Sequence, residues 1–212
     1  MFGLKNRKVK HLDGSFYYPQ NGIGTIFKSL SQLSDIEKFN LGNRVTEIFH
    51  NDNRITAIKL NYERTVEVDF IVSSLPIDKF IAGLNPKPPN EIINLTQLIK
   101  FRDLLLIIFL LDKESVNNNG SMYFPSNRFK FTRIYEPRNR SEKMCPKNKT
   151  SLIVEIPHQK SKDFQENGVE DLISTVKKQL MEIGLFNKDE IIKIETKNIV
   201  NAYPILNSKY EE

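Results

Sequence analysis

Cysteine and histidine are scarce in this chain of 212 residues, which contains one cysteine and three histidines. The single cysteine, Cys145, excludes a disulfide framework and a cysteine-based metal site within the chain. The histidines, His11, His50 and His158, lie far apart in the sequence and share no metal-ligand spacing. We therefore expect no metal centre, and the cysteine content fits a reducing, cytoplasmic location.

A hydrophobic run long enough to cross a membrane is also absent from the sequence. The longest apolar run extends from Leu104 to Leu111, between Asp103 and Asp112, whereas a transmembrane helix needs about 20 apolar residues. The first residues do not have the pattern of a secretory signal peptide. We expect no membrane span, and we interpret Leu104 to Leu111 as a buried strand.

The chain has no strong local excess of one charge. Its formal net charge is +5, and its 31 basic residues are interleaved with 26 acidic ones. The densest basic cluster, Lys5 to Lys10, has no aromatic residue beside it on which a base could stack. We interpret this cluster as a solvated surface and expect no nucleic-acid partner.

The motifs of several common enzyme classes are missing as well. Gly22 and Gly24 supply two of the three glycines of a dinucleotide-binding fingerprint, but Phe27 stands where the third would be. The sequence contains no Walker loop and no recognisable Ser/His/Asp set, so it identifies no catalytic residue. What this region does predict is a turn, followed by a helix from Ile23 to Leu33 with apolar residues at helical spacing.

The segments after this helix predict an α+β fold. Residues 41–50 and 54–60 are β-rich, flank an Asn-Asp-Asn turn and predict an antiparallel hairpin. Residues 66–73 first alternate and then become continuously apolar, which predicts a strand entering a buried sheet. The Pro-rich stretch from Asn85 to Pro89 is a stiff connection, which we interpret as a seam between two lobes.

Beyond this connection the pattern predicts a sheet with two flanking helices. Asn90 is expected to cap a helix that reaches about Lys100. Residues 169–183 have the clearest helical pattern in the chain, and Gly184 stands where a left-handed residue would end that helix. Strands are predicted at residues 104–111, 121–124, 129–135, 150–156 and 191–200.

Arg133 is the side chain in this sheet with the clearest binding chemistry. Alternation along residues 129–135 predicts Phe129, Phe131, Arg133 and Tyr135 on one face. An arginine among aromatic rings can fork onto a carboxylate or phosphate while the rings stack on a substrate. The alternative is a structural ion pair with Glu136 or Glu155, and the sequence leaves both interpretations open.

Five segments of the chain occur in the same order in one known family. They are Tyr18-Pro19-Gln20-Asn21-Gly22-Ile23-Gly24, Arg44-Val45-Thr46-Glu47-Ile48, Asp69 to Pro76, Arg133 to Pro137 and Ala202-Tyr203-Pro204. With these segments the chain resembles the FAD-dependent amine oxidase and protoporphyrinogen oxidase-like superfamily, especially its bacterial branch related to UDP-galactopyranose mutase. The resemblance covers essentially all 212 residues. It implies part of an FAD/NAD(P)-binding lobe and a substrate lobe with an antiparallel or mixed sheet flanked by helices.

The resemblance also implies contacts to FAD and to a small-molecule substrate. The backbone of Val45 would meet the adenine end of FAD, and the two glycines of the first segment would let the backbone pass close to the flavin. Arg133 and Tyr135 would face the substrate. The implied FAD-contacting positions are Gly22, Gly24, Val45, Ser74, Leu75 and Pro76.

The organisation expected from the resemblance is that of an internal fragment, without the N-terminal GxGxxG unit and the C-terminal FAD segment. Residues 1–84 would form the partial FAD-binding lobe, residues 85–200 the substrate-binding lobe, and residues 201–212 a return toward the FAD lobe. The implied function is that of an FAD-dependent oxidoreductase, inactive as an isolated fragment. Two alternatives stay open: a flavin-dependent sugar-nucleotide mutase and a non-catalytic binding module. The sequence does not indicate an oligomeric state.

Overall fold

The computed structural model describes residues 16–33, 39–51, 54–159 and 168–205. The chain divides into two compact units, and each is built from segments that are distant in sequence. One unit comprises residues 1–34, 106–156 and 170–196, and the other comprises residues 35–105, 157–169 and 197–212. The basic cluster Lys5 to Lys10 and residues 206–212 lie outside the described residues. In the described part of the chain, no helix is both long and apolar enough to cross a membrane.

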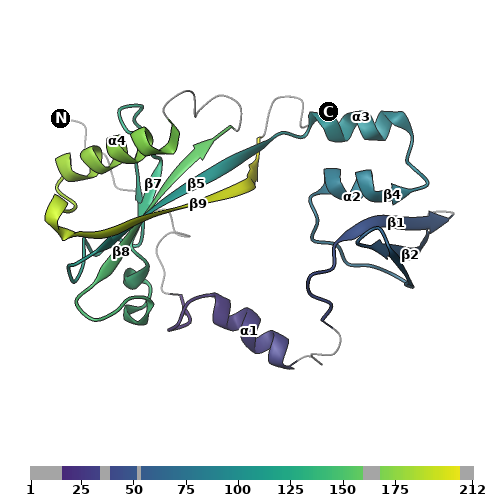
Figure 1. The fold of residues 1–212 in the computed structure, drawn as a ribbon, viewed down its shortest axis with the longest axis horizontal. Coiled ribbons are helices and arrows are strands. Elements are labelled where there is room, and N and C mark those ends of the chain that lie inside the picture. The colour runs from purple at the N-terminus through teal and green to yellow at the C-terminus, as the bar shows by residue number, and fades with distance from the viewer. Residues whose placement is uncertain (1–15, 34–38, 52–53, 160–167, 206–212) are drawn as a thin grey trace, which may run out of the picture. The chain divides into compact units, whose positions relative to one another are not determined.

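The first unit is organised around a five-stranded sheet with strand order β6-β7-β8-β5-β9. Two pairs in it, β6 with β7 and β7 with β8, are antiparallel. The long strands β5 and β9 run side by side through the sheet (Figure 1). The strands are β5 (Phe101–Leu111), β6 (Met122–Tyr123), β7 (Arg133–Tyr135), β8 (Thr150–His158) and β9 (Ile191–Pro204).

One face of this sheet is covered by helix α4 (Gly168–Glu182), whose Val176 and Leu180 are buried. Gly184 has the left-handed conformation, with φ of 75°, and ends the helix region as the sequence predicts. The buried side chains of β5, β7 and β8 form the core with those of α4 and the following loop. The apolar ones among them include Leu105, Ile107, Phe109, Leu111, Ile134, Leu152, Val154, Ile156, Val176, Leu180 and Phe186.

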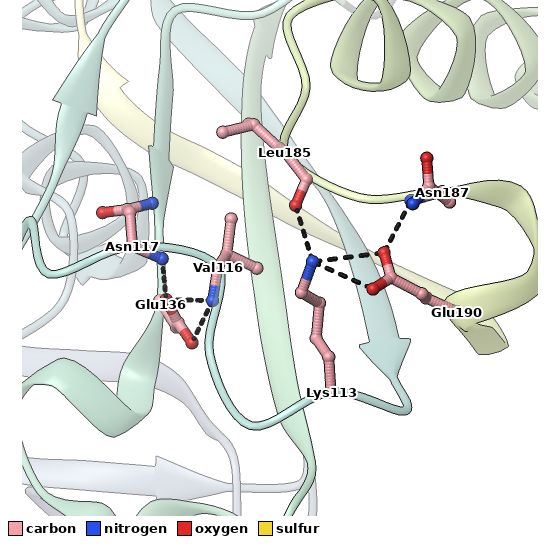
Figure 2. A network of polar contacts seen from close by, with 7 residues as sticks. All are labelled: Lys113, Val116, Asn117, Glu136, Leu185, Asn187 and Glu190. Carbon is pink, nitrogen blue, oxygen red and sulfur yellow. Dashed lines mark hydrogen bonds and ion pairs between the residues drawn. The ribbon is translucent and has the colours of Figure 1, made fainter.

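The loop that follows β5 is held by two polar networks (Figure 2). The Glu136 carboxylate, which is 1% exposed, accepts hydrogen bonds from the backbone N–H groups of Val116 and Asn117. It also accepts one from the Thr150 hydroxyl at 2.6 Å. In the second network, Lys113 donates to the Leu185 carbonyl and pairs with Glu190 at 3.1 Å. These bonds fix the loop to the sheet and to the segment after α4.

Helix α1 (Gly24–Leu33) also belongs to the first unit, and its position in the sequence agrees with the prediction. None of its residues is buried, although it carries the predicted apolar stripe. Two short 3₁₀ helices, η2 (Pro137–Asn139) and η3 (Glu142–Met144), lie between β7 and β8, and η4 (Lys188–Glu190) precedes β9.

The second unit contains a four-stranded sheet with order β3-β2-β1-β4. The predicted hairpin is confirmed: β1 (Val45–Asn51) pairs antiparallel with β2 (Arg54–Leu60), and β3 (Arg64–Glu67) continues the meander. Strand β4 (Leu84–Asn85) is parallel to β1, so the sheet is mixed. Two helices, α2 (Ile77–Gly83) and α3 (Asn90–Leu98), flank β4 in the sequence.

The strand predicted at residues 66–73 is wrong. Strand β3 ends at Glu67, and the last hydrogen bond to β2 joins the Val68 N–H to the Thr56 carbonyl. Strand β2 begins at Arg54, so its ladder offers almost no further partner beyond this point. The apolar side chains that follow are exposed, with Phe70 at 81% and Val72 at 95%. Continuous apolarity predicted burial, but burial needs a covering element as well as an apolar sequence.

Three smaller predictions also need correction. Strand β7 is shorter than predicted, because Phe129 and Phe131 pack with Phe124 in a ring cluster and are not part of the strand. Asn90 is the first residue of α3, and Pro89 occupies the capping position without a side-chain cap. The predicted seam after residue 84 falls inside the second unit, where β4 pairs with β1. The assignment of residues 1–84, 85–200 and 201–212 to functional lobes stays a prediction.

Candidate functional site

Arg133 forms a two-pronged ion pair with Glu155 on the face of the sheet opposite to α4. The antiparallel register places Arg133 directly across from Glu155 and Ile134 across from Val154. Because side chains alternate along a strand, buried Ile134 and Val154 point to the core, and the charged pair points to the other face. The Nε of Arg133 donates to Glu155 Oε2 at 2.8 Å, and its Nη2 donates to Oε1. Of the two interpretations of Arg133, the structure shows the ion pair, and its partner is Glu155.

Tyrosine rings surround this pair. The Arg133 guanidinium carbon lies 6.0 Å from the ring centre of Tyr123 and 5.4 Å from that of Tyr135. Arg140 approaches Tyr135 to 5.3 Å, so two guanidinium groups lie against one phenol ring. These distances are within the range of cation–π attraction. The cluster therefore combines planar cations and aromatic faces, which is the chemistry that binds planar anionic or aromatic ligands.

The ionisation of the cluster follows from its contacts. The hydrogen bond to Glu155 raises the pKa of Arg133 above its ordinary value, and Tyr123 contributes in the same direction. Burial raises the pKa of the Tyr135 phenol, and the negative charge of Glu155 adds to this effect. At neutral pH the cluster thus contains a permanently charged arginine and a neutral phenol that can donate a hydrogen bond.

The turn before α1 lies against the loop between β7 and β8. The Ser141 hydroxyl donates to the Gln20 carbonyl at 2.7 Å, and the Lys143 amine donates to the Gln20 side chain at 2.7 Å. Gly22 is buried against Met144 in a left-handed conformation, with φ of 88°. A Cβ at Gly22 would lie 2.9 Å from the Met144 sulfur, whereas a Cβ at Gly24 would meet no described atom within 4 Å. Gly22 is therefore required by the chain's own packing, and Gly24 leaves open space beside the backbone.

We predict that Gly22→Ala lowers the free energy of unfolding by about 1–3 kcal/mol, because alanine is strained at positive φ and its Cβ crowds Met144. The matched variant Gly24→Ala, at the first residue of α1, is expected to stay within about 1 kcal/mol of the parent protein. Urea unfolding of both variants measures the difference. Equal stability of the two variants would contradict the proposed role of Gly22.

A separate cavity of about 560 Å³ lies within the second unit and contains three of the predicted cofactor positions. Val45, Ser74 and Leu75 all line it, and Pro76 follows Leu75 directly. The start of β1, the segment after β3 and helix α2 supply its walls. The other lining residues are Asn43, Arg44, Thr46, Ile48, Ile58, Ile71, Val72, Ser73, Lys79 and Gly83.

The lining of this cavity fits one end of a dinucleotide. Apolar walls such as Ile48 and Ile58 suit a planar base, and the Arg44 and Lys79 side chains supply positive charge at the same cavity. The Ser73 hydroxyl accepts the Leu75 N–H at 3.2 Å, which fixes the turn that carries Ser74. The residues present thus fit the adenosine end of FAD. No complete glycine-rich loop accompanies them to hold its pyrophosphate, because the sequence has only two of the three glycines.

The structure brings some of the predicted site residues close together, and it adds two residues to the cluster around Arg133. Arg133 and Tyr135 lie together in the first unit, and Val45, Ser74 and Leu75 lie together in the second. Tyr123 and Arg140 were not predicted. Tyr123 is across from Arg133 in the register of β6 and β7, so a known strand pairing would have identified it. Nothing in the sequence singles out Arg140.

The fold is shared with several solved enzyme structures. The chain superposes on reduced UDP-galactopyranose mutase with a TM-score of 0.77 at 19% identity, over 88% of this chain and 40% of that chain. A protein from Exiguobacterium sp. 255-15, assigned as a protoporphyrinogen oxidase, gives a TM-score of 0.67 at 12% identity, over 88% and 40%. Putrescine oxidase bound to putrescine gives 0.61 at 14% identity, over 82% and 38%.

These matches define the class of fold. The chain shares its fold with these three structures, so the predicted fold resemblance and the α+β fold class are confirmed. Within that class, UDP-galactopyranose mutase, protoporphyrinogen oxidase and putrescine oxidase are proteins it is similar to. The chain spans 40% of the first two of these structures and 38% of the third. No protein-family model and no curated protein sequence matches it.

Proposed function

We propose that this chain is the part of an FAD-dependent oxidoreductase that lines the adenosine end of the cofactor and presents the substrate-binding face. The observation that carries the proposal is that Val45 lines one cavity of suitable chemistry together with Ser74 and Leu75, from which it is distant in sequence. The shared fold supports the same proposal. Bound FAD would supply hydride transfer, and the protein would supply binding and orientation.

Each group of residues has a distinct role in this proposal. In the cavity, the backbone of Val45 binds the adenine, and Ser74, Leu75 and Pro76 line the cofactor. Gly24, with open space beside it, lets the backbone pass close to a bound ring. On the sheet face, Tyr135 donates a hydrogen bond to the substrate, and Arg133 supplies positive charge through the guanidinium edge that Glu155 leaves uncovered.

A flavin-dependent sugar-nucleotide mutase is the second candidate function. It is favoured by the cluster of Arg133, Arg140 and tyrosine rings, because guanidinium groups bind diphosphates and aromatic rings stack on sugars and bases. Titration with UDP-sugars and with amine substrates separates the two candidates. Arg133→Lys keeps the positive charge but loses the planar pair of N–H donors that binds two oxygens at once. It should therefore weaken UDP-sugar binding and leave amine binding nearly unchanged. Absence of binding to either class would support a non-catalytic binding module.

We predict that the 212-residue chain binds FAD weakly, because its sequence holds no complete pyrophosphate loop. Leu75→Asp, which places a carboxylate in the cavity, should weaken this binding by about tenfold, corresponding to about 1.4 kcal/mol. Leu95→Asp is the matched control, since Leu95 lies on α3, is 59% exposed and does not line the cavity. Quenching of flavin fluorescence on titration with protein measures all three affinities.

Two results would contradict this prediction in different ways. Purification of the chain with stoichiometric yellow flavin would show that the expectation of weak binding is wrong. Equal FAD affinity in Leu75→Asp and Leu95→Asp would show that the cavity is not the cofactor site.

A further inference from the structure

A second hollow, of about 370 Å³, lies in the first unit beside the segment between β7 and β8. The proposed oxidoreductase function does not use it, and of the cluster around Tyr135 only Arg140 also lines it. All of its lining side chains are polar or charged, so it differs from the apolar cavity of the second unit. They are Asn118, Arg138, Asn139, Arg140, Ser141 and Glu142.

The positive charge at this hollow is poorly compensated by the protein. Arg138 reaches Glu114 only at 3.9 Å, and Glu114 is 76% exposed, which makes the pair weak. Within the described ranges, the buried Nε of Arg138 has no hydrogen-bond acceptor, and Arg140 forms no ion pair. The two guanidinium groups outnumber the one carboxylate of Glu142. An anion in the hollow would supply the missing negative charge.

The backbone around the two arginines is held in place. The Asn139 side chain, between them in sequence, donates to the Asn117 carbonyl at 2.7 Å and to the Asn119 carbonyl at 2.9 Å. Ser141, which follows Arg140, is tied to Gln20 by its hydroxyl. The Arg140 N–H closes the 3₁₀ turn on the Pro137 carbonyl at 3.0 Å. Because these bonds already order the loop, little further conformational entropy would be lost there when a ligand binds.

We propose that this hollow is a binding site for a small phosphorylated molecule, with the phosphate on Arg138 and Arg140. Guanidinium groups match the oxygens of a phosphate two at a time. The volume, about 370 Å³, is that of a site for a small organic molecule, and a bare phosphate would fill only part of it. Glu142, which also lines the hollow, repels a phosphate but can accept hydrogen bonds from hydroxyl groups, which suits a sugar phosphate.

Calorimetric titration with α-D-glucose 1-phosphate, inorganic phosphate and neutral glucose tests the site without flavin. We expect saturable binding of the sugar phosphate, weaker binding of phosphate and none of glucose. Arg138→Gln and Arg140→Gln should each weaken sugar phosphate binding by about tenfold. Arg128→Gln is the matched control, because Arg128 is exposed, lies against Phe129 and does not line the hollow.

The outcomes separate this site from the proposed function. Arg133 belongs to the cluster of the proposed function and does not line the hollow, so a loss of sugar phosphate binding in Arg133→Lys but not in Arg140→Gln would place the phosphate at that cluster and overturn the proposal. Thermal unfolding of each variant shows whether it is folded. If Arg138→Gln does not fold, the binding measured for Arg140→Gln alone tests the proposal. The proposal is overturned if glucose binds as well as its phosphate, if no titration saturates, or if a folded Arg140→Gln binds as tightly as Arg128→Gln.

Discussion

Replacing Glu136 by alanine lowers the free energy of unfolding by about 3–5 kcal/mol, the largest effect we expect from a single side chain. Glu136 is buried and accepts hydrogen bonds from the Val116 and Asn117 N–H groups (Figure 2). It also accepts one from the Thr150 hydroxyl. Truncation leaves one buried donor, on Thr150, and two partly buried donors without this acceptor, and each unsatisfied donor costs up to about 1–3 kcal/mol. Urea denaturation followed by circular dichroism measures the loss.

Two further variants show whether the hydrogen bonds of Glu136 are the cause. Glu136→Gln keeps the shape and one acceptor oxygen, so we expect a smaller loss than for alanine. Glu182→Ala is the surface control: Glu182 is at the exposed end of α4, 4.0 Å from Lys178, and its loss should be within about 0.5 kcal/mol of zero. A Glu136→Ala variant as stable as Glu182→Ala would show that the network contributes nothing.

Removing the guanidinium of Arg133 has the second largest expected effect. Arg133→Met leaves the Glu155 carboxylate, which is 7% exposed, without the two hydrogen bonds that compensate its burial. We expect a loss of about 3 kcal/mol, because an uncompensated buried charge costs more than the pair contributes. The double variant Arg133→Met/Glu155→Met should recover most of this loss, since methionine at both positions leaves no charge unpaired.

The double-mutant cycle measures the coupling between the two residues directly. The cycle needs urea unfolding curves for the parent protein, the two single variants and the double variant. If the two single losses simply add in the double variant, Arg133 and Glu155 are not coupled and the ion pair has no structural role. Arg133→Lys should lie between the parent and Arg133→Met, because an ammonium keeps the charge but not the fork.

The elements that were predicted correctly are those whose pattern depends on local chemistry. Apolar residues at helical spacing located α1 and α4, and the Asn-Asp-Asn turn located the hairpin of β1 and β2. The run between Asp103 and Asp112 located most of β5. Gly184 could be placed at the end of its helix because only a residue without Cβ adopts that conformation at no cost.

The elements that were missed depend on neighbours distant in sequence. Residues 69–75 have the composition of a buried strand but extend past the ladder that β2 offers, so they are not in a sheet. The short β4 has almost no sequence signal, and its pairing with β1 alone defines it as a strand. The same limit applies to the candidate site: Tyr123 joins Arg133 only through the register of β6 and β7.

The sequence by itself determined the α+β class, helices α1, α3 and α4 and the long strands, but not α2, and it indicated the fold that the chain shares with the solved structures. It also named Arg133 as the side chain of the sheet with the clearest binding chemistry. Only the tertiary structure decided that its partner is Glu155 and not Glu136, which is nearer in sequence. The reason is strand register: it places Glu155 across from Arg133, while Glu136 accepts hydrogen bonds from the loop after β5. Periodicity fixes which residues share a face, but the pairing of distant strands decides which of them meet.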